Sequence, residues 1–144
     1  MELEIKELTN VDEVLKAYDI YKHCMYMPTT EKYEKKILSF LQNENIKIFG
    51  CFIDGYLKGI SVISFFERYK SEVLGIAVDS SARNQGIGSY MVTTLKNTFN
   101  LDLICAETDD DAVVFYKKNG FNITEFTNNY DGQIVTRYKC ELKN

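Results

Sequence analysis

The feature that most constrains the fold is a glycine-containing turn at residues 83–88, Arg-Asn-Gln-Gly-Ile-Gly. An apolar run at 73–78 precedes it and an amphipathic run at 87–99 follows it, which predicts a strand, a turn and a helix. The first N–H groups of a helix lack partners within it, and the helix dipole makes that end positive. Because such a turn receives phosphate and Arg83 adds a cation, we predict that the protein holds a phosphorylated cofactor.

Composition narrows the class of protein. The chain has 144 residues, enough for a single domain over 1–144 with a substantial core. Its net charge of −4 gives no reason to expect a nucleic-acid partner. No apolar run approaches the ~20 residues that cross a bilayer, and the charged start of the chain is unlike a signal peptide. We therefore expect a cytoplasmic protein that binds neither nucleic acid nor membrane.

The metal-binding residue types are scattered. The sequence contains four cysteines and one histidine, His23, and no CxxC pair. A structural zinc site needs clustered ligands, so we expect no metal, and we expect His23 to have no catalytic role. Three of the four cysteines fall in apolar runs, which predicts reduced thiols in the core. The four are Cys24, Cys51, Cys105 and Cys140.

Hydrophobic periodicity predicts a mixed α/β sheet of six to seven strands with about four helices. A first helix is expected to be capped by Thr9 or Asn10, and Asp54-Gly55 is typical of a hairpin turn. The middle of the chain reads as strand, helix, strand, helix, which favours a right-handed crossover between parallel strands. The expected strands begin near residue 3 and lie at 46–53, 56–66, 73–78, 103–106, 121–126 and 134–142, and the later helices lie at 33–41, 87–99 and 110–119.

Two signatures then make residues 72–121 resemble the core of the GNAT superfamily, the N-acetyltransferases that use acetyl-CoA. The first is arginine/glutamine-x-x-glycine-x-glycine/alanine, and the second is asparagine-x-x-alanine-x-x-aromatic/leucine-tyrosine followed by a lysine-x-glycine-phenylalanine-like end. A Rossmann turn would need a third glycine or alanine where Met91 stands. The first signature reads Arg83, Gly86, Gly88 here, and the second reads Asp109, Ala112, Phe115, Tyr116, Gly120, Phe121.

The resemblance implies a GNAT-like, mostly antiparallel twisted sheet with a central, splayed parallel strand pair. It implies acetyl-CoA as the acyl donor, with its pyrophosphate on the turn amides and its pantetheine arm paired to the strand at 76–78. Gly75 supports this because a glycine within a strand often marks a close approach of another backbone. The implied cofactor-binding residues are Ile76, Ala77, Val78, Arg83, Asn84, Gln85, Gly86, Ile87, Gly88, Ser89, Asp109 and Tyr116.

The implied reaction is direct attack of a primary amine, small or peptidic, on the thioester. Glu72 is the first candidate base, at the spacing found in histone-acetylating members; Glu107 is the second, and water is a third possibility. Tyr116 matches the tyrosine that gives a proton to the departing thiolate, and an N–H near Ile76 or Ala77 would stabilise the oxyanion.

The sequence departs from the family pattern at two positions, Ser80 for proline and Asp109 for asparagine. The first should cost rigidity in the turn and not chemistry, whereas the second keeps an alternative open. An ionised carboxylate cannot donate a hydrogen bond to the cofactor arm. Asp109 therefore leaves room for a CoA-binding sensor or interaction module without catalysis. The acceptor amine stays open, and the terminal strands could pair two copies into a homodimer.

Overall fold

The structure is a computed structural model that describes residues 2–144. It alternates short helices with strands in the order expected from the sequence. The elements are β1 (Leu3–Glu7), α1 (Val11–Lys16), α2 (Tyr18–Tyr21), η1 (Lys22–Cys24), α3 (Thr30–Leu41), β2 (Ile46–Ile53), β3 (Tyr56–Glu67), β4 (Lys70–Val78), η2 (Ser80–Ala82), α4 (Ile87–Thr98), β5 (Leu103–Thr108), α5 (Val113–Lys118), β6 (Asn122–Tyr130) and β7 (Gln133–Lys143).

The strands form one seven-stranded sheet in the order β1-β2-β3-β4-β5-β7-β6. Every neighbouring pair is antiparallel except β4 and β5, which are parallel. Helix α4 lies between these two strands in the chain, so it is the crossover that a parallel pair requires. The mixed sheet with a central parallel pair is the fold class that the sequence predicts.

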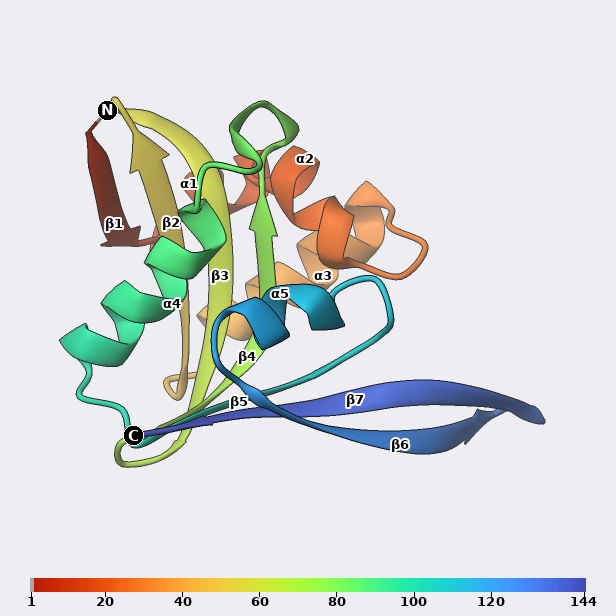
Figure 1. The fold of residues 1–144 in the computed structure, drawn as a ribbon. Helices are drawn as coiled ribbons and strands as arrows, with labels where there is room; N and C mark the ends of the chain where they lie inside the picture. Colours follow the sequence, from red (N-terminus) through yellow and green to blue (C-terminus); the bar gives the residue numbers. More distant parts are fainter. Residues whose placement is uncertain (1) are drawn as a thin grey trace.

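Helices cover both faces of the sheet (Figure 1). On one face, α1, α2 and α3 bury a cluster that includes Val14, Tyr21 and Ile37, all at most 1% exposed. On the other face, α4 and α5 bury a second cluster around Leu95 and Tyr116. The sheet is therefore the middle layer of three, and burial on both faces explains the continuous apolar runs of its central strands.

The parallel pair separates partway along its length. Strands β4 and β5 pair only from Lys70↔Leu103 to Glu72↔Cys105. Beyond that point β4 stays with β3 and β5 stays with β7, so the two strands part. Figure 1 shows β4 running upward while β5 leaves to the right beside β7. The splayed pair implied by the resemblance is present, and its opening exposes one edge of β4.

Several boundaries differ from the sequence prediction for identifiable reasons. The expected first helix divides into α1 and α2 at Ala17, after a start capped by the side chain of Asn10. The helix expected from residue 110 begins at Val113 because a carboxylate oxygen of Asp109 accepts hydrogen bonds from the next turn. Strand β6 continues through residues 128 and 129, since the tight turn of the hairpin is formed by Asp131 and Gly132, both with positive φ.

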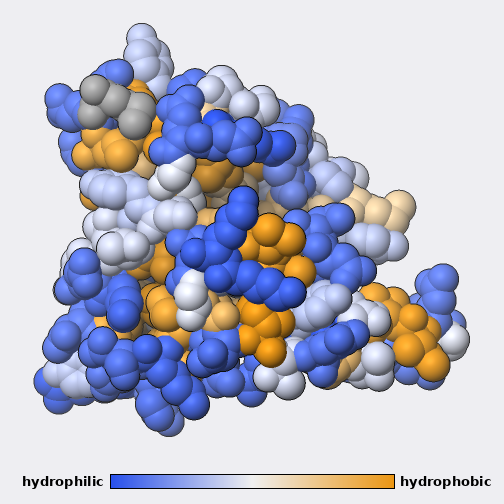
Figure 2. Space-filling model, viewed as in Figure 1, coloured by the Kyte–Doolittle hydropathy of each residue, from blue (hydrophilic) through white to orange (hydrophobic). Residues whose placement is uncertain are grey.

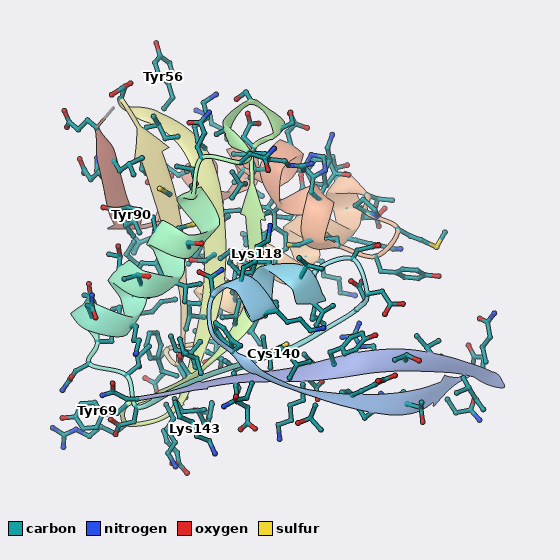
Figure 3. All side chains as sticks on the ribbon, in the orientation of Figure 1. Tyr56, Tyr69, Tyr90, Lys118, Cys140 and Lys143 are labelled. Atoms are coloured by element: carbon teal, nitrogen blue, oxygen red, sulfur yellow. The ribbon has the colours of Figure 1, made fainter. Side chains whose placement is uncertain are left out.

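The prediction of core thiols holds for two of the cysteines. Cys51 and Cys140 are completely buried, and Cys140 lies on β7 beneath α5 (Figure 3). Cys105 is half-buried. Cys24, which lies outside the apolar runs, is exposed, because the chain around it forms η1 at the surface.

The surface is mostly hydrophilic in the view of Figure 2, with an apolar group at the far end of the β6–β7 hairpin. Ile134 contributes to that end and is 75% exposed. Among the described residues, 2–144, no helix combines the length and the apolar character needed to span a membrane.

Candidate active site

The exposed edge of β4 begins at a bulge. The register between β3 and β4 shifts at Val62 and Ile63, so Val62 faces Gly75 while Ile63 faces Val73. A bulge bends its strand and changes the direction of the following backbone groups. Ile76, Ala77 and Val78 follow it, on the part of β4 that no longer pairs with β5. These are the residues predicted to pair with the pantetheine arm, and the splay leaves that side of the strand free.

Gly75 is required by its neighbour. A Cβ placed on it would lie 2.7 Å from Cζ and 2.8 Å from Cε2 of Tyr21, which is closer than real Cβ contacts. Tyr21 ends α2 and is 1% exposed. Its ring therefore lies directly against the backbone of β4 at the bulge. The close approach at Gly75 is therefore made by a side chain of a packed helix, whereas the approach of another backbone at this glycine stays a prediction.

The turn before α4 has the backbone expected of an anion receptor. Asn84 and Gly86 both have positive φ, +63° and +74°. Gly86 is the N-cap of the twelve-residue α4, and no side chain caps that end. No atom lies within 4 Å of the Cβ position of Gly86, so the protein leaves space beside this residue. The N–H groups of the first turn have no side-chain cap, as a phosphate-binding helix start requires.

The remaining residues of this turn have distinct environments. The Nε of Arg83 donates to the carbonyl of Val78 at 3.4 Å, so the guanidinium stays near the end of β4. Ile87 is buried, at 2% exposed, and ties the start of α4 to the core. Gln85 is exposed, and Ser89 is half-buried on the first turn of the helix. The predicted phosphate-binding residues thus lie together around one helix end.

Gly88 has a packing role that the sequence did not reveal. A Cβ on Gly88 would lie 2.7 Å from Cε1 of Phe115 in α5. The second glycine of the signature therefore admits an aromatic ring from the next helix. That ring brings α5, which carries Tyr116, against the start of α4.

Tyr116 is held by aromatic neighbours and is 5% exposed. Its ring packs edge-on against Phe115 and Phe121, each with a centroid distance of 5.1 Å. Burial raises the pKa of Tyr116 above its ordinary value, and the nearby thiols of Cys140 and Cys24 raise it further. A phenol in this setting keeps its proton at neutral pH, as a proton donor must.

Glu72 lies where β4 and β5 separate, opposite Cys105 in the last pair of the parallel ladder. Burial raises the pKa of its carboxyl, and the charge of Glu107 raises it further. The structure therefore brings the two candidate bases near each other, Glu107 being the more exposed. Cys105 lies among these acids, and its pKa rises to about 11 through burial and then through the charge of Glu72.

Asp109 is occupied by its own backbone. One oxygen of its carboxylate accepts from the N–H groups of Asp111 at 3.1 Å and Ala112 at 3.2 Å. This side chain forms the turn between β5 and α5. Next to it, the hydroxyl of Tyr138 donates to Asp110 at 2.6 Å and joins that turn to β7.

Cys24 is a neighbour of this site that sequence reasoning did not consider. Its thiol donates to the carbonyl of Tyr21 at 3.2 Å, and the N–H of Ile76 faces the sulfur. Cys24 is exposed, yet surrounding protein raises its pKa to about 11, as expected for a thiol inside an open cleft. A charge on Cys24 also raises the pKa of Tyr116, after burial and the thiol of Cys140. No local motif in the sequence could have indicated that Cys24 lies beside β4.

The residue types that bind metal ions are scattered in the part of the chain that the structure describes. Within residues 2–144, no set of three or more histidine, cysteine, aspartate or glutamate side chains is arranged to hold a metal ion.

With this geometry established, comparison with known proteins identifies the family. Residues 40–123 match the acetyltransferase (GNAT) domain. The match spans more than half of the chain and includes the β4 edge, the turn before α4 and Tyr116. The protein therefore belongs to the GNAT family of acetyl-CoA-dependent N-acetyltransferases. Among curated proteins, none matches the sequence.

Solved structures share the whole fold. The ribosomal-protein-S18-alanine N-acetyltransferase from Escherichia coli superposes with a TM-score of 0.76 at 19% identity, covering 99% of this chain and 94% of that chain. Ard1 from Thermoplasma volcanium gives 0.77 at 24% identity, with 99% and 98% covered. A GNAT family acetyltransferase from Elizabethkingia anophelis with acetyl-CoA bound gives 0.72 at 18% identity, with 99% and 98% covered.

Proposed function

We propose that residues 1–144 act as one N-acetyltransferase domain that moves the acetyl group of acetyl-CoA directly to a primary amine. The observation that carries this proposal is the open edge of β4, which leads from Glu72 past the bulge to the uncapped start of α4. One continuous path thus offers free backbone groups to a long ligand and free amides to its phosphates.

The residues present fit acetyl-CoA. The N–H groups from Asn84 to Ser89 would receive the pyrophosphate, with Arg83 as a neighbouring cation. The backbone of Ile76, Ala77 and Val78 would pair with the pantetheine amides. When bound, the molecule supplies an activated acetyl group as a thioester, and the protein supplies position and proton transfer.

Three groups would perform the chemistry. Glu72 would take a proton from the substrate ammonium group, because its raised pKa makes it a better base than an ordinary carboxylate, and the neutral amine would then attack the thioester carbonyl. The N–H of Ile76 or Ala77 would donate to the thioester oxygen as negative charge develops there. Tyr116 would give its proton to the departing sulfur, and its neutral, buried phenol is suited to that task. Glu107 and water are the alternative routes for the first proton.

A second function, CoA binding without catalysis, is favoured by Asp109. Its carboxylate bonds to its own turn, so it offers the cofactor arm no donor. The buried Tyr116 phenol keeps its proton at neutral pH. This favours catalysis, because a module that only binds CoA does not need a residue that protonates the departing thiolate.

Two measurements test the proposal in sequence. Acetyl-CoA and CoA should each raise the melting temperature, because a ligand that binds only the native state stabilises it, whereas NAD should have no effect. CoA release should then appear with at least one amine in a panel of peptide N-termini, lysine peptides, polyamines, amino sugars and amino acids. If neither CoA species at millimolar concentration raises the melting temperature, both functions are contradicted. Stabilisation without CoA release from any amine would favour the sensor.

A further inference from the structure

Side chains from the N-terminal helices border β4 where it has separated from β5. Segment η1 and helix α2 both contact β4. They bring Tyr21 onto Gly75 and the thiol of Cys24 to the N–H of Ile76. The hydroxyl of Tyr21 faces Cys24 as well. We define these two side chains, Tyr21 and Cys24, as the end wall.

The end wall lies where an acyl chain would extend, given the function proposed above. The thioester sulfur would lie near Tyr116 and its oxygen near the N–H of Ile76. Segment η1, which ends at Cys24, contacts β4, and Tyr21 lies against Gly75, next to Ile76 in the chain. A chain longer than acetyl would therefore run into Cys24, with Tyr21 behind it.

The wall is also rigid. The ring of Tyr21 packs on the ring of Tyr33, with centroids 5.6 Å apart, and Tyr33 is 1% exposed. The hydroxyl of Tyr33 donates to the carbonyl of Val14. The thiol of Cys24 is fixed by its hydrogen bond to the carbonyl of Tyr21. A wall tied to the core in this way cannot yield to extra methylene groups without loss of packing.

We propose that Tyr21 and Cys24 determine acyl-chain length, restricting the donor to acetyl-CoA over longer acyl-CoA thioesters. Each is a specificity-determining residue and not a proton-transfer group. A pocket of fixed size discriminates against one extra methylene by roughly 10–200-fold, so a two-carbon extension gives a measurable signal.

The test compares acetyl-CoA with butyryl-CoA by calorimetric titration and by kcat/KM. Wild-type protein should prefer acetyl-CoA in both readouts. Cys24→Ala should shift the ratio toward butyryl-CoA by about tenfold or more, because it removes the atom that faces Ile76. Tyr21→Phe, which keeps the ring, should give a smaller shift in the same direction. Cys51→Ala, a buried thiol on β2 away from the end wall, is the matched control and should leave the ratio unchanged.

The outcomes separate the two proposals. If Cys24→Ala binds acetyl-CoA normally and its ratio stays within about twofold of wild type, the end wall is refuted and the acetyltransferase proposal stands. If Cys24→Ala shifts the ratio but Tyr21→Phe does not, the Tyr21 hydroxyl has no part in the wall. If wild-type protein binds neither thioester, both proposals fail. Melting temperatures of all variants exclude misfolding as the cause.

Discussion

The proposed cofactor path has a phosphate end, at the turn before α4, and an acyl end, near Gly75 and Tyr116. The two ends are formed by different kinds of chemical group. At the phosphate end, the groups are backbone N–H donors held by one short loop with left-handed residues at Asn84 and Gly86. At the acyl end, a backbone N–H of β4 is joined by side chains from two regions far apart in the chain, Tyr21 and Cys24 in α2 and η1 and Tyr116 in α5. The contrast teaches that binding a common cofactor fragment needs only local geometry, whereas the chemical end needs the tertiary fold to bring side chains together.

The largest effect should come from breaking the acyl end at Tyr116. Tyr116→Phe should lower kcat about 100-fold, because the thiolate leaves without a proton donor, while the Kd for acetyl-CoA changes little. Steady-state kinetics and calorimetric titration measure the two quantities. If kcat is unchanged, Tyr116 is not the acid. If only the binding of acetyl-CoA is weakened, Tyr116 belongs to the cofactor pocket.

A smaller effect is expected at Glu72. Glu72→Gln should lower the rate about tenfold near neutral pH, with partial recovery at high pH where the amine loses its own proton. In wild type, the rate should rise as Glu72 deprotonates, with a midpoint above the ordinary carboxyl pKa. Glu107→Gln removes a neighbouring negative charge, so that midpoint should move to lower pH. If all three proteins have the same pH–rate profile, water and not a glutamate takes the proton from the amine.

The same carboxyl gives a stability prediction. A folded-state pKa above the unfolded value means that the ionised form of Glu72 disfavours the folded state. Glu72→Gln should therefore raise the melting temperature near pH 7. The gain should shrink as the pH falls through the folded-state pKa and vanish below the unfolded value. A gain that persists in acid would point to a different cause, such as altered packing.

The phosphate end can be broken through its backbone. Gly86→Val places a β-branched residue at a φ of +74°, a strain of about 1–2 kcal/mol, and should weaken CoA binding about tenfold. Gly132→Val is the matched control, since that glycine has a φ of +83° and equally open space but lies in the β6–β7 turn. Both variants should lose similar stability, and only the first should lose affinity. If the two variants bind CoA with equal affinity, the turn before α4 is not the phosphate-binding site.

The smallest effect is expected at two buried serines, Ser61 on β3 and Ser71 on β4. The hydroxyls of Ser61 and Ser71 are buried under α4 and have no hydrogen-bond partner within residues 2–144. Ser71→Ala should therefore raise the free energy of unfolding by about 1 kcal/mol, because it removes an unpaired polar group. Denaturant titration measures this, with cofactor affinity unchanged. A loss of stability would show that the hydroxyl is satisfied by a bound water molecule.

The sequence predicts the local structure of the turn before α4 well and the packing around Tyr21 and Cys24 poorly, for a physical reason. The glycine turn and the strands around it are local patterns, and the structure has them at nearly the predicted positions. Cys24 and Tyr21 meet Gly75 and Ile76 only because α2 and η1 pack on β4. Periodicity places each of these residues on its own element but carries no information on which elements touch.

The same limit explains the local misses. A turn formed by Asp109 precedes α5, and a run of three aspartates does not show which of them will form it. Tyr116 was identified through the family signature, while its aromatic surroundings emerge only from the fold. Its predicted role as an acid, like those of Glu72 and Glu107, stays a prediction.

The ring of Phe115 that fills the space above Gly88 has a consequence for engineering this protein. It acts as a strut between the helix start that would grip the coenzyme and the tyrosine next in the chain. Enlarging residue 88 would push this ring and disturb Tyr116, the proposed acid, which follows it in α5. Mutational libraries that vary one of these positions should vary the other in the same clone, since useful combinations would be missed by changing them singly.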